Sequence, residues 1–208
     1  MLNELLKRYP VLKDCKDDII AARDTIIKCY ESGGKLLLCG NGGSCADCDH
    51  IVGELMKGFL RKRPLSENQK QQMRNNCAFI NDDVLDKLQN ALPAISLPNI
   101  AALNSAFCND VDPELIYAQS LMSLGKENDV LVSISTSGNS KNVFAASTVA
   151  KSLGIKVIGL TGGTGGKLKE IVDICVTVPE KETYKIQELH LPVYHYICAS
   201  VEEYFYNQ

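Results

Sequence analysis

The features that would mark a membrane or nucleic-acid-binding protein are missing from this 208-residue sequence. No apolar run approaches the roughly 18 residues that a membrane span requires. Basic residues are not in excess, since 22 Lys and Arg face 25 Asp and Glu for a net charge of −3. This balance argues against a nucleic-acid-binding surface. The first residues, MLNELLKRYPVLKD, are charged and amphipathic, unlike a signal peptide. We therefore expect neither a membrane nor a nucleic acid among the partners.

The nine cysteines do not form the even, regularly spaced set of a disulfide framework. They are scattered through apolar segments, as expected of buried thiols in a reducing compartment, which predicts a cytoplasmic protein. Cys45 and Cys48 form a CxxC pair, a pattern that also occurs in metal and redox sites. Because no second CxxC is present and nothing indicates secretion, we interpret these two residues as incidental thiols.

Two loops rich in glycine and serine each follow a short apolar run and precede a helical pattern: GNGGS at 40–44 and STSGNS at 135–140. Glycine lets the backbone approach an anion closely, and serine and threonine hydroxyls add hydrogen-bond donors. The N-terminus of the following helix contributes unpaired N–H groups and the positive end of its dipole. The repeated strand, loop and helix therefore predict a phosphorylated small molecule as the ligand.

Histidine is scarce, with only three residues in the chain: His50, His190 and His195. His50 and Glu54 are four residues apart, which places them on one face of a helix that starts at GNGGS. An exposed helical pair worth only ~0.2–0.5 kcal/mol is the plainer alternative. The adjacent loop favours an acid/base role, and hence an enzyme that acts on a phosphorylated sugar. His190 lies between apolar residues and is expected to pack in the core.

The order of the remaining segments indicates an α/β fold in a single domain, residues 1–208. Strands are expected at 35–39, 94–97, 129–134, 156–160 and 174–178, and helices at 2–8, 17–30, 44–59, 98–107, 113–124, 139–152, 167–171 and 184–206. Such alternation predicts a parallel sheet covered by helices on both faces, with ligands at the carboxyl ends of the strands.

Three segments stand apart from this alternation. Residues 1–33 form an N-terminal helical segment, and the polar stretch at about 60–93 reads as an insertion or mobile lid with a short helix near 82–92. For LTGGTGG at 160–166 we favour a structural role as a helix cap over ligand binding.

Taken together, these motifs resemble the SIS (sugar isomerase) domain family, and within it the phosphoheptose isomerases. The similarity spans nearly the whole chain except 60–93. It rests on GNGGS, Asp47, HIVGE at 50–54, ND at 109–110, STSGNS, LTGGTGGKL at 160–168 and IQELHLPVYH at 186–195. The resemblance implies a flavodoxin-like five-stranded parallel sheet. It also implies a homotetramer with sites between subunits, and a zinc ion in each site.

The resemblance also implies roles for individual residues. The substrate-binding loop corresponds to Asn41, Gly42, Gly43 and Ser44, and the phosphate-binding loop to Ser135, Thr136, Ser137 and Ser140. Further substrate contacts correspond to Asn109, Asp110 and Gln187. The metal ligands correspond to His50, Glu54, Gln187 and His195, of which Glu54 and His195 are also the implied acid/base pair.

This pattern predicts a phosphosugar isomerase that converts a ketose phosphate to an aldose phosphate through an enediolate. Sedoheptulose 7-phosphate is the expected ketose, and surface-polysaccharide precursors are the expected destination of the product. A carboxylate can take the proton next to the carbonyl, and an imidazole can serve the oxygens. Two alternatives remain open: a non-catalytic SIS adaptor similar to the replication initiator-associating protein, and a phosphosugar-sensing binding protein.

Helix geometry constrains the metal site. Gln187 and His195 are eight residues apart, or about 12 Å along a straight helix, too far to hold one ion together. Pro192 between them can kink the helix, but a kink hardly closes such a gap. We therefore expect one ligand to come from a neighbouring subunit. Two departures from the family pattern concern specificity: Tyr184 replaces an acidic residue, and KGF at 57–59 replaces GRY, so Lys57 only partly stands in for an arginine.

Overall fold

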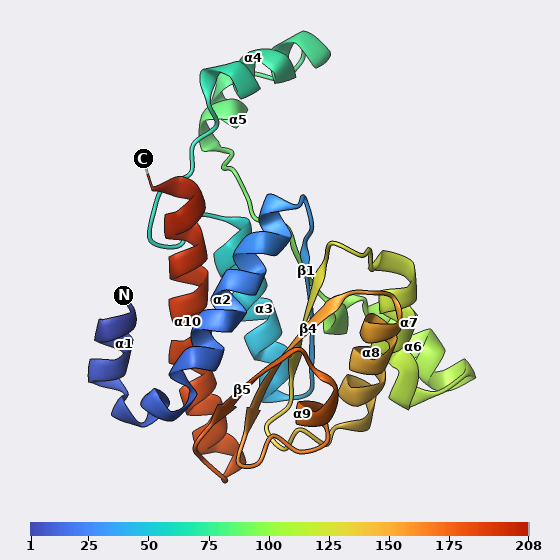
Figure 1. The fold of residues 1–208 in the computed structure, drawn as a ribbon. Coiled ribbons are helices and arrows are strands. Elements are labelled where there is room, and N and C mark those ends of the chain that lie inside the picture. The colour runs from blue at the N-terminus through green and yellow to red at the C-terminus, as the bar shows by residue number, and fades with distance from the viewer. Residues whose placement is uncertain (208) are drawn as a thin grey trace.

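Five short apolar segments form a parallel sheet in the order β2-β1-β3-β4-β5 in the computed structural model, which describes residues 1–207 (Figure 1). The strands are β1 (Leu36–Gly40), β2 (Ala94–Ser96), β3 (Val130–Ile134), β4 (Lys156–Gly162) and β5 (Ile174–Val178). Adjacent strands are parallel throughout. This is the strand order of flavodoxin-like sheets, so the predicted fold class is confirmed.

Helices cover both faces of the sheet. They are α1 (Leu2–Arg8), α2 (Lys16–Glu31), α3 (Gly43–Met56), α4 (Glu67–Asn76), α5 (Asp82–Lys87), α6 (Ala101–Asp110), α7 (Ile116–Leu124), α8 (Lys141–Ser152), α9 (Leu168–Ile171) and α10 (Thr183–Tyr206). Figure 1 shows α2, α3 and α10 on one side of the sheet and α7 and α8 on the other. No helix among residues 1–207 is both long and apolar enough to cross a membrane.

Alternating side chains of the strands build two separate cores. In β1, Leu36 and Leu38 face the core shared with α2, α3 and α10. Leu37 and Cys39 face the core shared with α7, α8 and α9. Every residue of β1 is buried, as expected of a central parallel strand that is covered on both faces. The sheet is therefore a rigid platform whose carboxyl edge carries the loops that follow β1 and β3.

Several helices differ from those expected from the sequence, and two of them end early: α3 ends at Met56 rather than 59, and α5 ends at Lys87 rather than 92. The helix expected at 98–107 begins later, at Ala101, and ends at Asp110 as α6. Its start is delayed because Pro98 lies in a short 3₁₀ turn, Leu97–Asn99. A second 3₁₀ turn, Pro113–Leu115, likewise precedes α7. A further difference is α4, a helix that was not expected in the polar stretch at 60–93, which we interpret from the sequence as an insertion or mobile lid. Ser66 and Gln69 form a capping box at its start, a signal that was present in the sequence.

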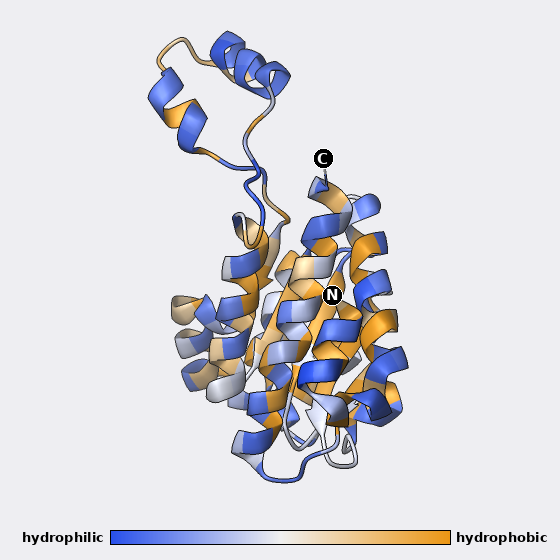
Figure 2. Cartoon of the chain, turned by 90° about the vertical axis from the view of Figure 1, so that its left-hand side faces the viewer, coloured by the Kyte–Doolittle hydropathy of each residue, from blue (hydrophilic) through white to orange (hydrophobic). Residues whose placement is uncertain are grey.

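The predicted insertion forms an arm, which we define as residues 65–88 with helices α4 and α5. Figure 2 shows that the arm projects from the body, is largely hydrophilic and is joined to the body by two extended segments of the chain. The chain enters and leaves through an antiparallel bridge between Pro64 and Gln89. The only fully buried apolar side chain of the arm, Leu85, belongs to neither core of the body in the described residues. The arm thus packs on itself rather than on the sheet.

Candidate active site

The two predicted ligand loops lie next to each other at the carboxyl edge of the sheet. They follow β1 and β3, which are neighbours in register from Leu36 opposite Val130 to Gly40 opposite Ile134. The side-chain amides of Asn41 and Asn142 exchange hydrogen bonds of 2.8 and 2.9 Å. This contact joins the first loop to the helix that follows the second. The sheet therefore brings residues 40–44 and 135–140 together, as a shared phosphosugar site requires.

The loop 135–140 has the donors and the open helix end of an anion site. Ser135 and Ser140 bring their hydroxyl oxygens within 3.0 Å of each other, and the Ser137 hydroxyl accepts from the Asn139 N–H. Ser140 precedes α8, but its side chain caps none of the N–H groups of that helix. Thr136 and Ser140 are partly exposed and Ser137 is exposed. An N-terminus without a side-chain cap suits a phosphate group.

Glycine 138 fixes this loop against the segment LTGGTGG. Its φ of 65° is left-handed, and a Cβ there would lie 1.9 Å from the carbonyl oxygen of Gly165. In addition, Leu168 N donates to Gly138 O and Lys167 N donates to Asn139 Oδ1. LTGGTGG therefore has the structural role favoured from the sequence, although it buttresses the neighbouring loop rather than capping a helix through a side chain.

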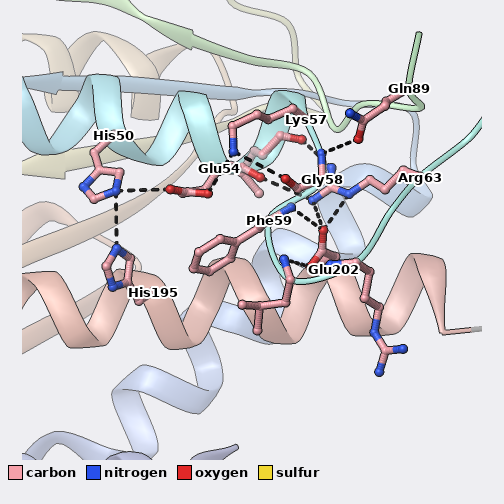
Figure 3. Close-up of polar contacts among 12 residues, drawn as sticks. His50, Glu54, Lys57, Gly58, Phe59, Arg63, Gln89, His195 and Glu202 are labelled. Carbon is pink, nitrogen blue, oxygen red and sulfur yellow. Dashed lines mark hydrogen bonds and ion pairs between the residues drawn. The ribbon is translucent and has the colours of Figure 1, made fainter. Parts of the chain in front are cut away.

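Helices α3 and α10 run side by side in the same direction, so residues numbered about 144 apart meet along their length (Figure 3). At their N-terminal ends, the amide of Gln187 covers Gly43, where a Cβ would lie 2.5 Å from Gln187 Nε2. Two turns further along, His195 faces His50. Helix α10 is continuous through Pro192. Gln187 and His195 therefore stay eight residues apart, as the expected geometry requires.

His50, Glu54 and His195 converge within one chain, and we call them the catalytic trio after the role expected from the sequence for Glu54 and His195. His50 Nε2 lies 3.2 Å from Glu54 Oε1 and 3.4 Å from His195 Nε2, as the dashed lines of Figure 3 show. Burial lowers the pKa of His195, and the neighbouring His50 lowers it further, whereas Glu54 acts in the opposite direction. His195 is therefore neutral at neutral pH, the form in which an imidazole can both accept and give a proton.

Contacts at the other ring nitrogen of His50, Nδ1, set the orientation of its imidazole. The Tyr194 hydroxyl donates to Asp47 Oδ1 at 3.2 Å and lies 3.0 Å from His50 Nδ1. Because that hydroxyl has a single proton, His50 Nδ1 carries the hydrogen of the second contact. His50 then presents the lone pair of Nε2 to Glu54. Two acceptors 3.2 Å apart need a proton or a cation between them.

The donors of the catalytic trio are of the kinds that bind zinc, imidazole nitrogen and carboxylate oxygen. In a tetrahedral site with bonds of about 2.0–2.1 Å, the ligand atoms would be about 3.3 Å apart. The two distances at His50 Nε2 are close to that value. Even so, as they stand in the structure, residues 1–207 contain no group of three or more His, Cys, Asp or Glu that could hold a metal ion. The trio therefore has the donor types of a zinc site, whereas its side chains contact one another directly instead of surrounding an ion.

The other residues predicted for the site lie outside the catalytic trio. Asn109 and Asp110 are exposed at the end of α6 and bond to each other, and no hydrogen bond joins them to either loop within residues 1–207. Gln187 reaches the first loop rather than the trio. Lys57, noted in the sequence only as a partial replacement for an arginine, places Nζ 3.5 Å from Glu54 Oε2.

Gly58 occupies the position where an arginine was expected. A Cβ there would lie 2.3 Å from the carbonyl oxygen of Arg61, so the local backbone leaves no room for a larger residue. Tyr184, the other departure, is exposed at the start of α10 beside Lys185. Tyr194 and the buried pair Arg63 and Glu202 were not anticipated, since no local pattern relates residues so distant in the chain.

Three residues interpreted from the sequence as structural or incidental lie in surroundings that agree with that interpretation. His190 is fully buried and its Nε2 donates to Thr161 O, and burial lowers its pKa to about 4. Cys48 is fully buried and Cys45 partly so, and both thiols are free. Burial also raises the pKa of the Cys48 thiol, which makes it a poor nucleophile and a poor metal ligand.

Comparison with known proteins gives a consistent set of relatives. A model of the SIS domain matches residues 2–83 and 87–162. Phosphoheptose isomerase of Aneurinibacillus thermoaerophilus is 39% identical over 177 residues, 85% of this chain and 76% of the relative. That of Roseiflexus sp. is 35% identical over 91% of this chain and 83% of its own. Among solved structures, phosphoheptose isomerase GmhA from Neisseria gonorrhoeae has a TM-score of 0.76 at 29% identity, covering 97% of this chain and 94% of its own.

Proposed function

The chain belongs to the SIS domain family, and we propose that it is an aldose–ketose isomerase that interconverts sedoheptulose 7-phosphate and a heptose 7-phosphate. Relatives named phosphoheptose isomerase match most of its length. The observation that carries the proposal is the direct contact of His50, Glu54 and His195 in a chain whose sheet also presents two serine–glycine loops. An isomerase of sugar phosphates needs both a proton-transfer group and an anion-binding group.

The loops bind and orient the substrate. Ser137 and Ser140 with the N-terminus of α8 hold the phosphate, far from the carbons that react. Asn41 and the backbone of Gly43 offer polar groups to the sugar chain from the adjacent loop. Binding energy from the phosphate thus positions the reacting carbons, which lowers the entropic part of the barrier.

Glu54 is the base of the proposed reaction. Its carboxylate removes a proton from C1 of the ketose, the electrons move into the C1–C2 bond, and negative charge develops on the C2 oxygen. Neutral His195 accepts the proton of the C1 hydroxyl and passes it to that oxygen. Glu54 then returns its proton to C2, which leaves the carbonyl at C1 of the aldose. Lys57 Nζ lies 3.5 Å from Glu54 Oε2 and so places a positive charge beside the carboxylate that takes the proton.

Zinc is the metal that we propose for the catalytic trio, on the basis of its donor atoms and their spacing. His50 Nε2, Glu54 Oε1 and His195 Nε2 would hold the ion. When bound, zinc would supply Lewis-acid stabilisation of negative charge on the substrate oxygens. With the ion bound, His195 Nε2 would be a ligand and could not accept the hydroxyl proton, so the transfer of that proton by His195 belongs to the metal-free site. Glu54 Oε2, in contrast, would remain free to move the carbon-bound proton. Tyr194 supports this arrangement because it holds the other nitrogen of His50.

We further propose a homotetramer in which neighbouring subunits complete each site. The catalytic trio comes from one chain, whereas Gln187 lies about 12 Å from His195 along the same helix. Among the four implied ligands, Gln187 is therefore the one that a neighbour would lend. This proposal accounts for a fourth ligand that the chain does not bring to its own trio.

We place the reaction in the cytosol, upstream of surface-polysaccharide precursors. All nine cysteines are free, and six of them are buried or partly buried within the two cores or α3 (Cys15, Cys29, Cys39, Cys45, Cys48 and Cys198). Free thiols of this kind suit a reducing compartment. A heptose phosphate as product suits the synthesis of lipopolysaccharide or capsule precursors.

Turnover of a panel of 2-ketose phosphates, together with zinc content by mass spectrometry, tests the proposal. We expect conversion of sedoheptulose 7-phosphate by the wild-type protein. Glu54→Gln keeps the shape and hydrogen-bonding capacity of the side chain but removes the base, so kcat should fall at least ~10²-fold. Glu203→Gln, which changes a partly exposed carboxylate at the far end of α10, is the matched control and should keep wild-type turnover.

Two outcomes would count against the proposal. A wild-type rate in Glu54→Gln would mean that another group abstracts the proton. Inactivity of the wild-type protein on every ketose phosphate, with phosphosugar binding retained in calorimetry, would instead favour an adaptor or a sensor built on the same fold.

A further inference from the structure

A buried ion pair, Arg63 with Glu202, lies where the arm joins the body and at the end of α3 (Figure 3). Both side chains are fully buried, and Nη2 of Arg63 is 2.8 Å from Oε1 of Glu202. The ring of Tyr206 covers the guanidinium, whose carbon is 4.8 Å from the ring centroid. Neither charged group is hydrogen-bonded to a side chain of the catalytic trio, and the proposed reaction does not use them.

Glu202 binds the backbone of the loop that follows α3. Its Oε1 accepts from Phe59 N at 2.8 Å and from Arg63 Nε at 2.8 Å. Its Oε2 accepts from Leu60 N at 2.7 Å and from Arg61 N at 3.1 Å. One carboxylate on α10 therefore fixes three consecutive backbone N–H groups of the loop.

Arg63 binds the C-terminal end of α3 in addition to Glu202. Nη1 donates to Leu55 O at 2.6 Å, and Nη2 donates to Glu54 O at 3.3 Å. Carbonyls in the last turn of a helix have no partner within the helix, and a positive charge there is favoured by the helix dipole. The last turn of α3 is the turn that carries Glu54. Its orientation relative to α10 is thus set by a guanidinium that is itself bound to α10.

The loop held by Glu202 also reaches the other catalytic residue. The ring of Phe59 lies 5.6 Å from the ring of His195, centroid to centroid, and forms one wall beside that imidazole. Because Phe59 N is bound to Glu202, the pair constrains the surroundings of both Glu54 and His195.

Stability alone is a weak explanation for such a pair. The cost of removing two charges from water often exceeds their attraction, so apolar residues of similar volume commonly serve a core as well or better. Fixed geometry is what the pair provides and what an apolar replacement would not, since it binds three N–H groups and two carbonyls in addition to itself.

We propose that Arg63 and Glu202 are positioning residues for the isomerase reaction: they hold the last turn of α3 and the loop 57–63 against α10, so that Glu54 and His195 keep their productive arrangement. The inference rests on the proposed function for its kinetic consequences. Displacement of a reacting group by about 1 Å is sufficient to lower a rate by up to ~10².

Arg63→Lys and Glu202→Gln test this role with minimal loss of volume. Lysine lacks the fork that reaches two carbonyls and a carboxylate at once. Glutamine keeps one acceptor oxygen but turns an N–H group toward backbone N–H donors. Each variant should lower kcat about tenfold or more. The KM for the sugar phosphate should stay within about threefold, because the phosphate is bound at the loops at the opposite end of α3.

The neighbouring pair Arg61 and Glu203 supplies the matched control. These residues lie on the same loop and helix, and their side chains meet at 3.3 Å, but both are partly exposed rather than buried. Arg61→Lys and Glu203→Gln should therefore keep wild-type kcat and KM. Variants at 63 and 202 that fold, melt at a lower temperature and yet keep wild-type kcat would show a merely structural role and overturn the proposal.

Two further measurements keep the test decisive. If substitutions at 63 and 202 prevent folding, Tyr206→Leu removes only the ring that covers the guanidinium. It should lower kcat about threefold with KM unchanged, and an unchanged kcat would overturn the proposal.

The NMR signals of the His195 ring, identified by their loss in His195→Asn, report the placement of that ring without the need for turnover. They should shift in Arg63→Lys but not in Arg61→Lys. This shift remains a test even if the wild-type protein turns over no sugar phosphate, an outcome that would defeat the proposed function separately.

Discussion

His190 and His195 lie on the same helix but have different surroundings, and that difference sets their chemistry. His190 is fully buried, and its Nε2 donates to Thr161 O. His195 is partly exposed at the edge where α3 meets α10, next to His50 and Glu54. Burial lowers the pKa of both imidazoles, to about 4 for His190. Both are neutral near pH 7, one as part of the core and the other as part of the site.

The pKa of His190 predicts a specific loss of stability in acid. An unfolded chain binds a proton at this residue below about pH 6.5, whereas the folded chain resists protonation until about pH 4. Between these values the unfolded state holds more protons, so the free energy of unfolding falls as the pH decreases. The fall should approach roughly 3 kcal/mol by pH 4. Urea unfolding of the wild-type protein and of His190→Gln, at pH 7, 5.5 and 4.5, measures it.

The variant provides the comparison. His190→Gln keeps a donor for Thr161 O but has no group that titrates in this range. Its stability should therefore decline less steeply than that of the wild-type protein below pH 6.5. Parallel curves for the two proteins would show that His190 does not carry the acid sensitivity.

At the scale of elements, local patterns in the sequence were sufficient for the sheet and the two loops. Short apolar runs predicted all five strands, and glycine with serine after β1 and β3 predicted the loops at its carboxyl edge. Helix α4 was missed because none of its residues is buried, so it lacks the apolar periodicity that identifies a helix. The position of the arm was not predictable from the sequence either. The loop that leads into the arm is bound by Glu202, which is far away in the chain.

The arm should be removable without loss of the body. Pro64 and Gln89 already pair as antiparallel neighbours, so residues 65–88 can be replaced by the hairpin turn Asn-Gly. We expect a melting temperature within a few degrees of the wild-type value, because the arm contributes to neither core. Asn90 retains its bonds to Arg63 O and Pro64 O. Calorimetry, with molecular mass from light scattering, provides the measurement.

The outcomes separate two explanations. A large fall in melting temperature at unchanged mass would contradict a self-packed arm. A fall that accompanies a lower mass would instead place the arm in an interface between copies. In its own chain the arm lies beyond the C-terminal end of α10, and the ligand loops lie near the N-terminal end of that helix (Figure 1). It therefore does not cover those loops.

At the scale of the whole molecule, the site depends on contacts between α3 and α10, which are separated by about 144 residues. His50 and Glu54 were predictable as a pair from their spacing, and the resemblance to a known family added His195 and Gln187. Their grouping was not predictable, since spacing along α10 showed only that Gln187 and His195 cannot reach one ion together. The structure assigns His195 to the trio of its own chain and Gln187 to Gly43.

Mixing inactive variants tests how this division is used in an oligomer. Glu54→Gln with His195→Asn should recover no activity after subunit exchange, because the trio comes from one chain and every site retains one defect. Glu54→Gln with Gln187→Ala should partly recover, provided that Gln187→Ala alone is defective. A chain with intact Glu54 then receives intact Gln187 from its neighbour. Exchange is confirmed by native mass spectrometry of tagged subunits.

Recovery in the first mixture would contradict a trio from one chain, and no recovery in the second would assign Gln187 to its own chain. A monomer in light scattering would rule out shared sites altogether.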